Sequence, residues 1–214
     1  MTPLPKQALK ARKTPRQARS LITVDAICEA TIQVLLDNGP IDLTTTRVAE
    51  RAGVSVGSLY QYFPNKEVLF LAVNERYLTA LAQRMEAVCL EHRARTYAEM
   101  AAALVGTYIA AKTDDRDVTI ALYRAAAQVN VAEIVEVMAR RIETASAAMF
   151  ATASDATFRD LSTVNSMMLN VLCGTVRNVF ERDMSDLLVG GELQEQLTHM
   201  FCTYLDAVKV AADR

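Results

Sequence analysis

The sequence predicts an all-α protein of about nine helices, with a three-helix N-terminal domain and a larger C-terminal helical domain. All five prolines lie at or before Pro64, so the following 150 residues keep every backbone donor that a helix needs. Alternating runs of Val, Ile and Thr bounded by hairpin turns, which would indicate strands, are almost absent. Apolar residues instead recur at helical spacing.

The first helix is expected over residues 20–38. Its inward face has the i, i+3, i+4, i+7, i+8 spacing of a half-buried helix. That face consists of Ile27, Ala30, Thr31, Val34 and Leu35. Gly39 and Pro40 end the helix, because glycine adopts the left-handed conformation there and proline cannot continue a helix.

Two short helices are expected next, over residues 45–52 and 56–62. Thr44 can cap the first and Ser55 the second. Gly53 between them permits the positive φ that a sharp turn requires. The inward residues of this unit are Val48, Ala49, Ala52, Val54, Leu59 and Phe63.

Longer helices make up the rest of the chain. Pro64 and Asn65 interrupt the chain first, and short polar clusters of a length that suits helix connections separate the later helices. The expected ranges are 66–92, 97–112, 117–128, 131–151, 157–182 and 192–212.

Charge is divided unevenly along the chain. The net charge is −2 overall, but residues 1–66 carry +4 and the remainder carries −6. A basic N-terminal third on an acidic body indicates that only one end binds a polyanion. Residues 1–19 hold six bases and no acid. This arm is either a solvated leader or a segment that follows DNA phosphates or the minor groove.

The cysteines indicate free thiols. They are Cys28, Cys89, Cys173 and Cys202. No CxxC pair occurs, and only His92 and His199 are available to join them as metal ligands. We expect four buried, reduced thiols, with a redox sensor as the alternative, and neither a metal site nor a cofactor.

The N-terminus lacks an apolar signal segment, and no run approaches the roughly 18 apolar residues of a membrane span, which predicts a cytoplasmic protein without membrane contact.

The two short helices and their turn predict a DNA-reading unit. A helix that protrudes from the protein surface fits into the major groove, where its N-terminal residues contact base edges. An ordinary corner inside a helical protein is the alternative. The predicted outward residues of the second helix are Ser55, Val56, Ser58, Tyr60, Gln61 and Tyr62. The full set of predicted DNA contacts adds Gly57, the segment Thr44, Thr45, Thr46 and Arg47, and Lys66, which begins a helix whose N-terminal dipole attracts phosphate.

The residues around this unit follow the pattern of a known family. The matching positions are 27–31, Leu35, Gly39, Thr44, Val48, Ala49, 52–55, 57–60, Tyr62, Phe63, Lys66, Glu67 and Leu69. With them, residues 20–75 resemble the DNA-binding region of the TetR family of bacterial regulators, whereas the last 130 or so residues match only in helical layout.

The resemblance implies a homodimer that binds a palindromic operator in double-stranded DNA, usually as a repressor that a small ligand releases. Its DNA contacts would fall at Thr44, Thr46, Tyr60, Tyr62 and Lys66. Many relatives place Lys or another polar residue where Val56 stands, so this position offers only an apolar contact, for example to a thymine methyl.

The helices expected over residues 157–182 and 192–212 are apolar on more than one face, which requires burial on two sides. Gly174 would allow a second helix to approach closely. We therefore expect a four-helix interface between two copies of the chain. The alternative is a helix pair that is wholly internal to one chain.

An apolar pocket for a small-molecule effector is expected in the C-terminal domain, because nine Met and no Trp suit a plastic cavity. Its candidate residues are Tyr108, Tyr123, Met138, Phe150, Met167, Asn170 and Arg177. Core packing is the more common use of such Met and aromatic residues. Asn170 and Arg177, two turns apart, would orient a polar end of the ligand, or else serve the dimer interface or a surface pair.

These features predict a DNA-binding transcription regulator with a basic arm (1–19), a helix-turn-helix domain (20–80) and a ligand-binding and dimerisation domain (81–214). The alternatives are an activator of the same type and a helical protein-interaction module without DNA binding. An enzyme is not expected, since no nucleophile–base pair, paired carboxylates or phosphate loop is evident. A largely apolar effector would change the spacing of two recognition helices through the helix that begins at Lys66.

Overall fold

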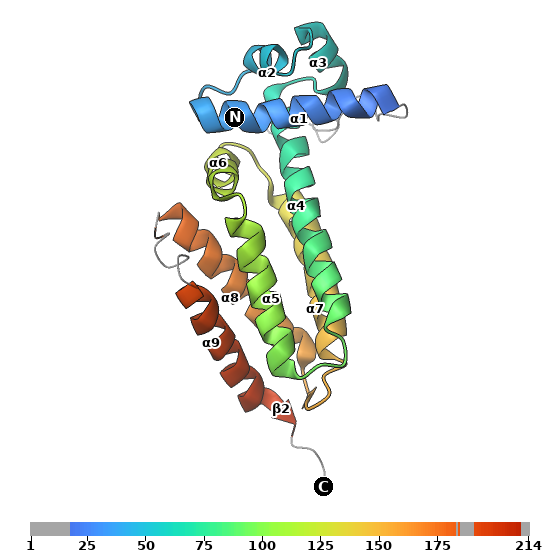
Figure 1. Cartoon of the computed structure of the whole chain (residues 1–214), viewed down its shortest axis with the longest axis vertical. Helices are drawn as coiled ribbons and strands as arrows, with labels where there is room; N and C mark the ends of the chain where they lie inside the picture. Colours follow the sequence, from blue (N-terminus) through green and yellow to red (C-terminus); the bar gives the residue numbers. More distant parts are fainter. Residues whose placement is uncertain (1–17, 183, 185–190, 211–214) are drawn as a thin grey trace. The chain divides into compact units, whose positions relative to one another are not determined.

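The computed structural model describes residues 18–182, 184 and 191–210, which form nine α-helices and one short two-stranded ladder (Figure 1). The helices are α1 (Ala18–Asn38), α2 (Thr45–Arg51), α3 (Val56–Tyr62), α4 (Lys66–Glu91), α5 (Tyr97–Thr113), α6 (Arg116–Ala126), α7 (Ala132–Phe150), α8 (Leu161–Glu181) and α9 (Glu192–Val208). The strand β1 (Thr157–Phe158) pairs antiparallel with β2 (Lys209–Val210). The predicted all-α class is confirmed, and most of the predicted basic arm lies outside the described residues.

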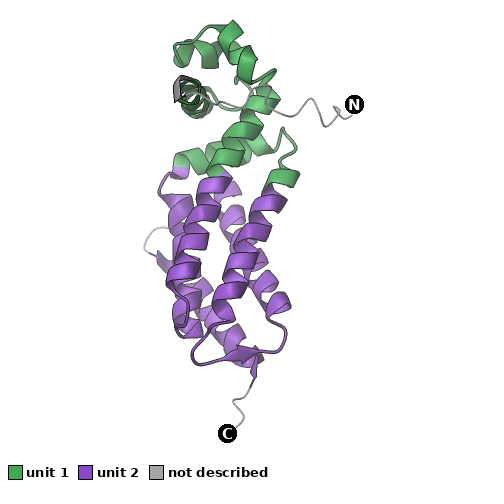
Figure 2. Cartoon of the chain, turned by 90° about the vertical axis from the view of Figure 1, so that its right-hand side faces the viewer, with its two compact units in different colours: residues 1–77, 117–134 green, residues 78–116, 135–214 purple. Residues whose placement is uncertain are grey.

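Contacts divide the chain into two compact units (Figure 2). Unit 1 comprises Met1–Tyr77 and Asp117–Ile134, so it holds α1, α2, α3, the first part of α4 and nearly all of α6. Unit 2 comprises Leu78–Arg116 and Val135–Arg214. Unit 1 therefore includes a segment after residue 116 that the predicted boundary at residue 80 assigned to the C-terminal domain.

Unit 1 is built around an apolar core to which all of its helices contribute. The predicted inward face of α1, from Ile27 to Leu35, is buried there, as are Val48, Leu59 and Phe63. Side chains of α4 and α6 complete the core, among them Leu69, Phe70 and Leu122. Burying these groups removes apolar surface from water, which is the main force that holds the short helices in place. 

The ends of the short helices follow the predicted local signals. The Thr44 Oγ1 atom accepts a hydrogen bond from the Arg47 backbone N–H at 3.3 Å, and the Ser55 Oγ atom accepts one from the Ser58 N–H at 3.0 Å. Gly39 and Gly53 adopt φ angles of +75° and +66°, which a side chain would strain. The two caps and two glycines therefore fix the ends of α1, α2 and α3.

In unit 2, α9 packs along α5 and also contacts α8 (Figure 1). A capping box starts α5: the Thr96 hydroxyl accepts from the Glu99 N–H at 3.3 Å, and the Glu99 carboxylate accepts from the Thr96 N–H at 2.9 Å. Gly106 allows the close approach of α9, because Gln194 Nε2 lies 3.1 Å from the point where a Cβ would stand.

Two predicted helix ends were wrong by several residues. The helix expected from residue 157 begins at Leu161, where the Asp160 carboxylate caps it by accepting from the Thr163 N–H at 3.2 Å. Residues 157–158 instead pair with residues 209–210, and this pairing also ends α9 before the predicted residue 212. The other predicted bounds agree with the structure to within two residues.

The four cysteines are free thiols. Cys28 and Cys89 are buried, and burial raises the pKa of Cys89 to about 12. Cys173 and Cys202 are only half-buried, so the prediction of four buried thiols was wrong for these two. In the part of the chain that the structure describes, no helix is long and apolar enough to cross a membrane, and no three potential metal ligands gather.

Candidate DNA-binding surface

α2 and α3 form a corner whose turn is closed by backbone hydrogen bonds. The Val54 N–H donates to the Ala49 carbonyl at 3.0 Å, and the Gly53 N–H donates to that of Glu50 at 3.1 Å. Arg51, at the end of α2, pairs with Asp37 of α1 and donates to Gln33 at 3.2 Å. The bonds of Arg51 attach the α2–α3 corner to α1, and the ion pair with Asp37 partly neutralises the charge of Arg51 within unit 1.

α3 presents a polar surface on its exposed side. Tyr60 is 42% exposed, and Gln61, Ser55 and Gly57 are exposed as well. The hydroxyl oxygens of Ser55 and Ser58 lie 2.8 Å apart. Hydroxyl and amide groups both donate and accept hydrogen bonds, so this surface can bond to phosphates or to base edges.

One hydrogen bond joins the two short helices across this surface. The Thr45 Oγ1 atom of α2 lies 3.1 Å from the Tyr60 hydroxyl oxygen of α3, and either group can be the donor. Because the bond links residues 15 positions apart, it restrains the tip of the Tyr60 ring beside the start of α2. The Tyr60 hydroxyl is therefore held in one place before any ligand arrives.

The residues predicted to contact the DNA backbone are accessible to solvent. Thr44, Thr46, Arg47 and Lys66 are all exposed. Arg47 donates to the Asp42 carbonyl at 3.0 Å and lies 3.3 Å from its carboxylate, so its charge is partly engaged. The Asn65 side chain accepts from the Val68 N–H at 2.8 Å, which caps α4 and leaves Lys66 in its first turn.

Two residues that were predicted to point outward lie against the core instead. Tyr62 is only 8% exposed, and its ring centroid lies 6.5 Å from that of Phe63. Val56 is half-buried and packs on the same core. The reason is spacing: Val56, Leu59 and Tyr62 stand three residues apart and so share one face of a short helix. 

The predicted pocket residues do not all come together. Tyr108, Met138 and Phe150 are buried in unit 2. Tyr123 is half-buried and belongs to unit 1. Three of the seven residues are therefore available to an interior site in unit 2.

The other three predicted pocket residues lie on the exposed face of α8. Met167 is 53% exposed. The Asn170 side chain donates to the Ser166 carbonyl at 2.8 Å, and Arg177 donates to Glu181 at 2.6 Å. These side chains do not line an interior pocket of unit 2, because they stand opposite the buried face of α8. Their position leaves the two alternative roles, at an interface between two chains or in a surface pair such as Arg177 with Glu181.

Sequence reasoning overlooked Lys112, which is 2% exposed in unit 2. Burial lowers its pKa from 10.5 to about 8. Its Nζ atom lies 5.9 Å from the centroid of the Tyr108 ring, one helical turn earlier in α5. The available signal was a single basic residue near the end of an otherwise apolar stretch, four positions after a tyrosine.

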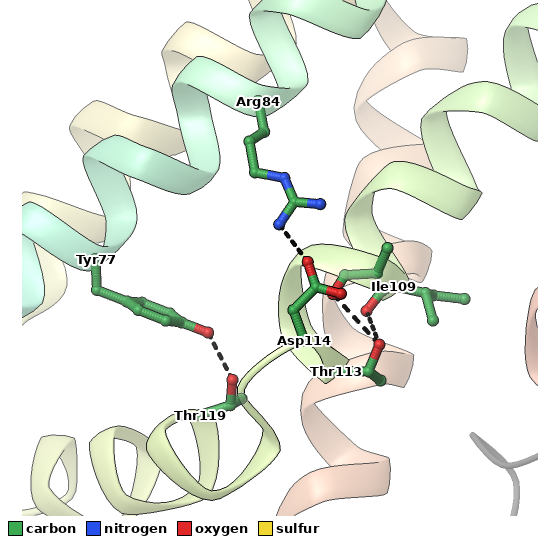
Figure 3. Close-up of polar contacts among 7 residues, drawn as sticks. Tyr77, Arg84, Ile109, Thr113, Asp114 and Thr119 are labelled. Carbon is green, nitrogen blue, oxygen red and sulfur yellow. Dashed lines mark hydrogen bonds and ion pairs between the residues drawn. The ribbon is translucent and has the colours of Figure 1, made fainter.

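Each unit also fixes its own part of α4 by a polar contact (Figure 3). In unit 1 the Tyr77 and Thr119 hydroxyl oxygens lie 2.6 Å apart and join α4 to α6. In unit 2 Arg84 donates to Asp114 at 2.7 Å and joins α4 to the residue that follows α5.

Two family models match this chain. Residues 27–73 match the model described as "Bacterial regulatory proteins, tetR family". Residues 96–205 match the model described as "Tetracyclin repressor-like, C-terminal domain", which alone spans more than half of the chain. A curated relative, the fatty acid metabolism regulator protein of Bacillus subtilis (strain 168), is 32% identical over 60 residues. That match covers 28% of this chain and 31% of the relative, so it spans under a third of the relative's length.

Solved structures share the fold over most of the chain. The fatty acid degradation regulator FadR of Bacillus halodurans has a TM-score of 0.68 at 18% identity, over 88% of this chain and 96% of its own. FadR of Bacillus subtilis, in complex with stearoyl-CoA, has a TM-score of 0.66 at 18% identity, over 83% and 96%. A TetR-family regulator of Mesorhizobium loti MAFF303099 has a TM-score of 0.69 at 19% identity, over 91% and 100%.

At such identities these likenesses establish the fold, and the two family models establish the relationship. The family and the structural neighbours are transcription regulators and not enzymes. The capped α2–α3 corner with its exposed hydroxyl surface agrees with the DNA-binding half of such a regulator. This chain belongs to the TetR family of bacterial regulators.

Proposed function

We propose that this chain is a homodimeric cytoplasmic repressor that binds a palindromic operator and leaves it when a small, largely apolar ligand binds. The observation that carries the proposal is the exposed end of α3, where Tyr60 is braced by Thr45 on a firmly packed corner. A short helix held in this way can enter the major groove without further ordering, which limits the entropy lost on binding.

The DNA contacts of the proposal fall into two groups. In this proposal Ser55, Gly57, Ser58, Tyr60 and Gln61 of α3 contact base edges and nearby phosphates, with the half-buried Val56 beside them. Thr44, Thr45, Thr46 and Arg47, at the start of α2, contact phosphates on one side of these positions. Lys66, at the start of α4, contacts phosphates on the other side. Positive side chains that neutralise phosphates release counterions, so affinity will depend strongly on salt.

Two copies of the chain supply the two recognition helices. Successive major grooves on one side of B-DNA lie about 34–36 Å apart, so a palindromic site needs a symmetric pair of proteins. The exposed face of α8, with Met167 and Gly174, and the 45% exposed Met200 of α9 support a shared four-helix interface. Apart from its chain neighbours and the nearby backbone of α8, no described residue lies within 4 Å of the point where a Gly174 Cβ would stand, so a partner helix has room to approach.

The interior of unit 2 supports an apolar effector. Met100, Met138, Met149 and Met168 are buried in this unit, and their flexible side chains can rearrange around a hydrocarbon chain. One structural neighbour, FadR of Bacillus subtilis, is described in complex with stearoyl-CoA. We therefore propose a ligand with a long acyl chain. It changes DNA affinity only to the extent that it prefers one conformation of the dimer.

The experiment is fluorescence polarisation of the full chain with labelled duplexes that tile the DNA upstream of its own gene. The expected result is one duplex bound with a Kd of about 10⁻⁸ M or tighter, and release of that duplex by stearoyl-CoA. Equal, weak binding to every duplex would contradict the operator, and a duplex that no acyl ligand displaces would contradict the effector. Residues outside the DNA surface provide the control: Arg140→Gln, in α7, should leave both results unchanged.

A further inference from the structure

The short helix α2 carries two arginines, and the structure gives them different partners. Arg51, in its last turn, reaches α1, where it pairs with Asp37 and donates to Gln33 at 3.2 Å. These partners stand 14 and 18 positions earlier in the chain, so the two bonds join separate helices. Arg51 is therefore a structural tie between α2 and α1.

Arg47, in the first turn of α2, has a local partner instead. Its Nη1 atom donates to the Asp42 carbonyl at 3.0 Å and lies 3.3 Å from the Asp42 carboxylate. Asp42 stands five positions earlier, in the loop between α1 and α2, so this pair joins no second helix to α2. The Arg47 side chain is 47% exposed and that of Asp42 is 61% exposed. An ion pair so open to water contributes little to stability, so Arg47 can exchange its partner readily.

A DNA phosphate would compete with the Asp42 carboxylate for the Arg47 guanidinium group. Both are anions that accept charge-assisted hydrogen bonds from arginine. If the phosphate replaces the carboxylate, the Arg47–Asp42 pair is lost on binding. If the carboxylate stays, its charge repels the phosphate. In either case DNA binding is weaker than it would be with an unpaired arginine at this position.

We propose that Asp42 limits the affinity of this surface for DNA by competing with phosphates for Arg47. Asp42 is a positioning residue, because it acts through the arginine. The proposal rests on the proposed function, since Arg47 is one of its phosphate contacts. It deepens that function by predicting that Asp42 lowers affinity for DNA of any sequence, because phosphate contacts carry no sequence information.

The test is a double-variant cycle on the full chain, measured by fluorescence polarisation. The proteins are the wild type, Asp42→Asn, Arg47→Gln and the double variant. The probes are the duplex that the tiling experiment identifies and a duplex of random sequence. Asp42→Asn should bind both duplexes about two- to fivefold more tightly, the range expected for one exposed ion pair. In the Arg47→Gln background the same change should have almost no effect.

A salt titration gives a second readout that a purely structural role would not change. Asp42→Asn makes one more unpaired cation available to a phosphate. The slope of log affinity against log salt concentration should therefore become steeper by up to about 0.9, and this increase should also vanish in the Arg47→Gln background.

Glu50→Gln is the matched control. Glu50 is an exposed acid of the same helix, and it forms no ion pair with Arg47 in the part of the chain that the structure describes. Its removal changes the net charge by the same amount as Asp42→Asn. Any gain in affinity from Glu50→Gln should therefore be equal in the wild-type and Arg47→Gln backgrounds.

Two results would overturn the proposal alone. One is a gain from Asp42→Asn that persists in Arg47→Gln, which would indicate general repulsion of DNA. The other is unchanged or weaker binding by Asp42→Asn. Equal, weak binding of the wild type to every duplex would contradict the operator, yet the cycle on the random duplex would still decide the role of Asp42. Failure to bind either duplex at low ionic strength would contradict both. Should Asp42→Asn not fold, as judged by circular dichroism, the cycle is repeated with Asp42→Ser.

Discussion

The Thr45 hydroxyl at the start of α2 and the Tyr60 hydroxyl of α3 lie 3.1 Å apart, within hydrogen-bond distance. Tyr60 is nevertheless 42% exposed, so its hydroxyl can be restrained by Thr45 and still meet a ligand. A hydroxyl group can donate one hydrogen bond while it accepts another. The pair therefore forms one polar unit on the candidate DNA-binding surface.

Removing either hydroxyl should weaken binding to the operator through the same interaction. Tyr60→Phe should lower affinity by about fivefold, corresponding to one hydrogen bond of about 1 kcal/mol. Thr45→Val should have a smaller effect, and the double variant should bind no more weakly than Tyr60→Phe alone. The measurement is fluorescence polarisation, with Tyr97→Phe in unit 2 as the control. Additive losses would show that the two hydroxyls act independently.

Tyr62 should matter first for stability. Tyr62→Ala leaves a cavity in the core of unit 1 and should lower the free energy of unfolding by about 2–4 kcal/mol. Tyr62→Phe keeps the ring and should unfold at nearly the same urea concentration as the wild type. Urea titrations followed by circular dichroism measure both. An alanine variant as stable as the wild type would contradict the buried position of Tyr62.

The local structure around the DNA-binding surface was largely predictable, because its signals lie close together in the sequence. Thr44 and Ser55 each cap a helix three residues before their partner N–H, and Gly53 needs only its own φ angle. The inward orientation of Tyr62 was not predictable from its hydroxyl group. Packing of the ring against the core under α3 determines that orientation, and the polarity of the side chain does not.

The dimer should depend on the open surface around Gly174. Gly174 is exposed, and a Cβ added there would have no atom from another element of the described chain within 4 Å, so we expect the Gly174→Leu monomer to stay folded. It should block the approach of a partner helix and raise the dimer dissociation constant by tenfold or more, a change of about 1.4 kcal/mol. Sedimentation velocity measures the change. Ala139→Leu, on the exposed side of α7, is the control. A Gly174→Leu chain that dimerises like the wild type would place the interface elsewhere.

Lys112→Met should stabilise the chain at pH 7, since it removes a buried charge. The pKa of Lys112 falls from 10.5 to about 8 on folding, a shift worth up to about 3 kcal/mol. Below pH 8 the folded chain bears this whole penalty. Between pH 8 and 10.5 the unfolded chain binds more protons than the folded chain, so the stability of the wild type should rise relative to Lys112→Met. Chemical denaturation at pH 7, 8, 9 and 10 measures the difference. A difference that stays constant with pH would contradict a buried, titrating lysine.

Long-range relationships were the part that the sequence could not supply. The pairing of residues 157–158 with 209–210 joins segments about 50 positions apart and shortens both α8 and α9 relative to their helical patterns. The burial of Lys112 likewise depends on α8, which brings Cys173 near it, and not on its own sequence neighbours. Asn170 and Arg177 are the opposite case. Their two-turn spacing places them on one face of α8, but their own sequence neighbours do not reveal that this face is exposed.

The central claim, that α3 reads DNA as part of a symmetric pair, is tested most directly by footprinting. The full chain would be incubated at low ionic strength, without effector, with the DNA upstream of its own gene. The account predicts protection of two half-sites related by symmetry, with centres about one helical turn apart, and loss of protection as salt is raised. Uniform cleavage with no protected segment, at protein concentrations where the chain is folded, would contradict it.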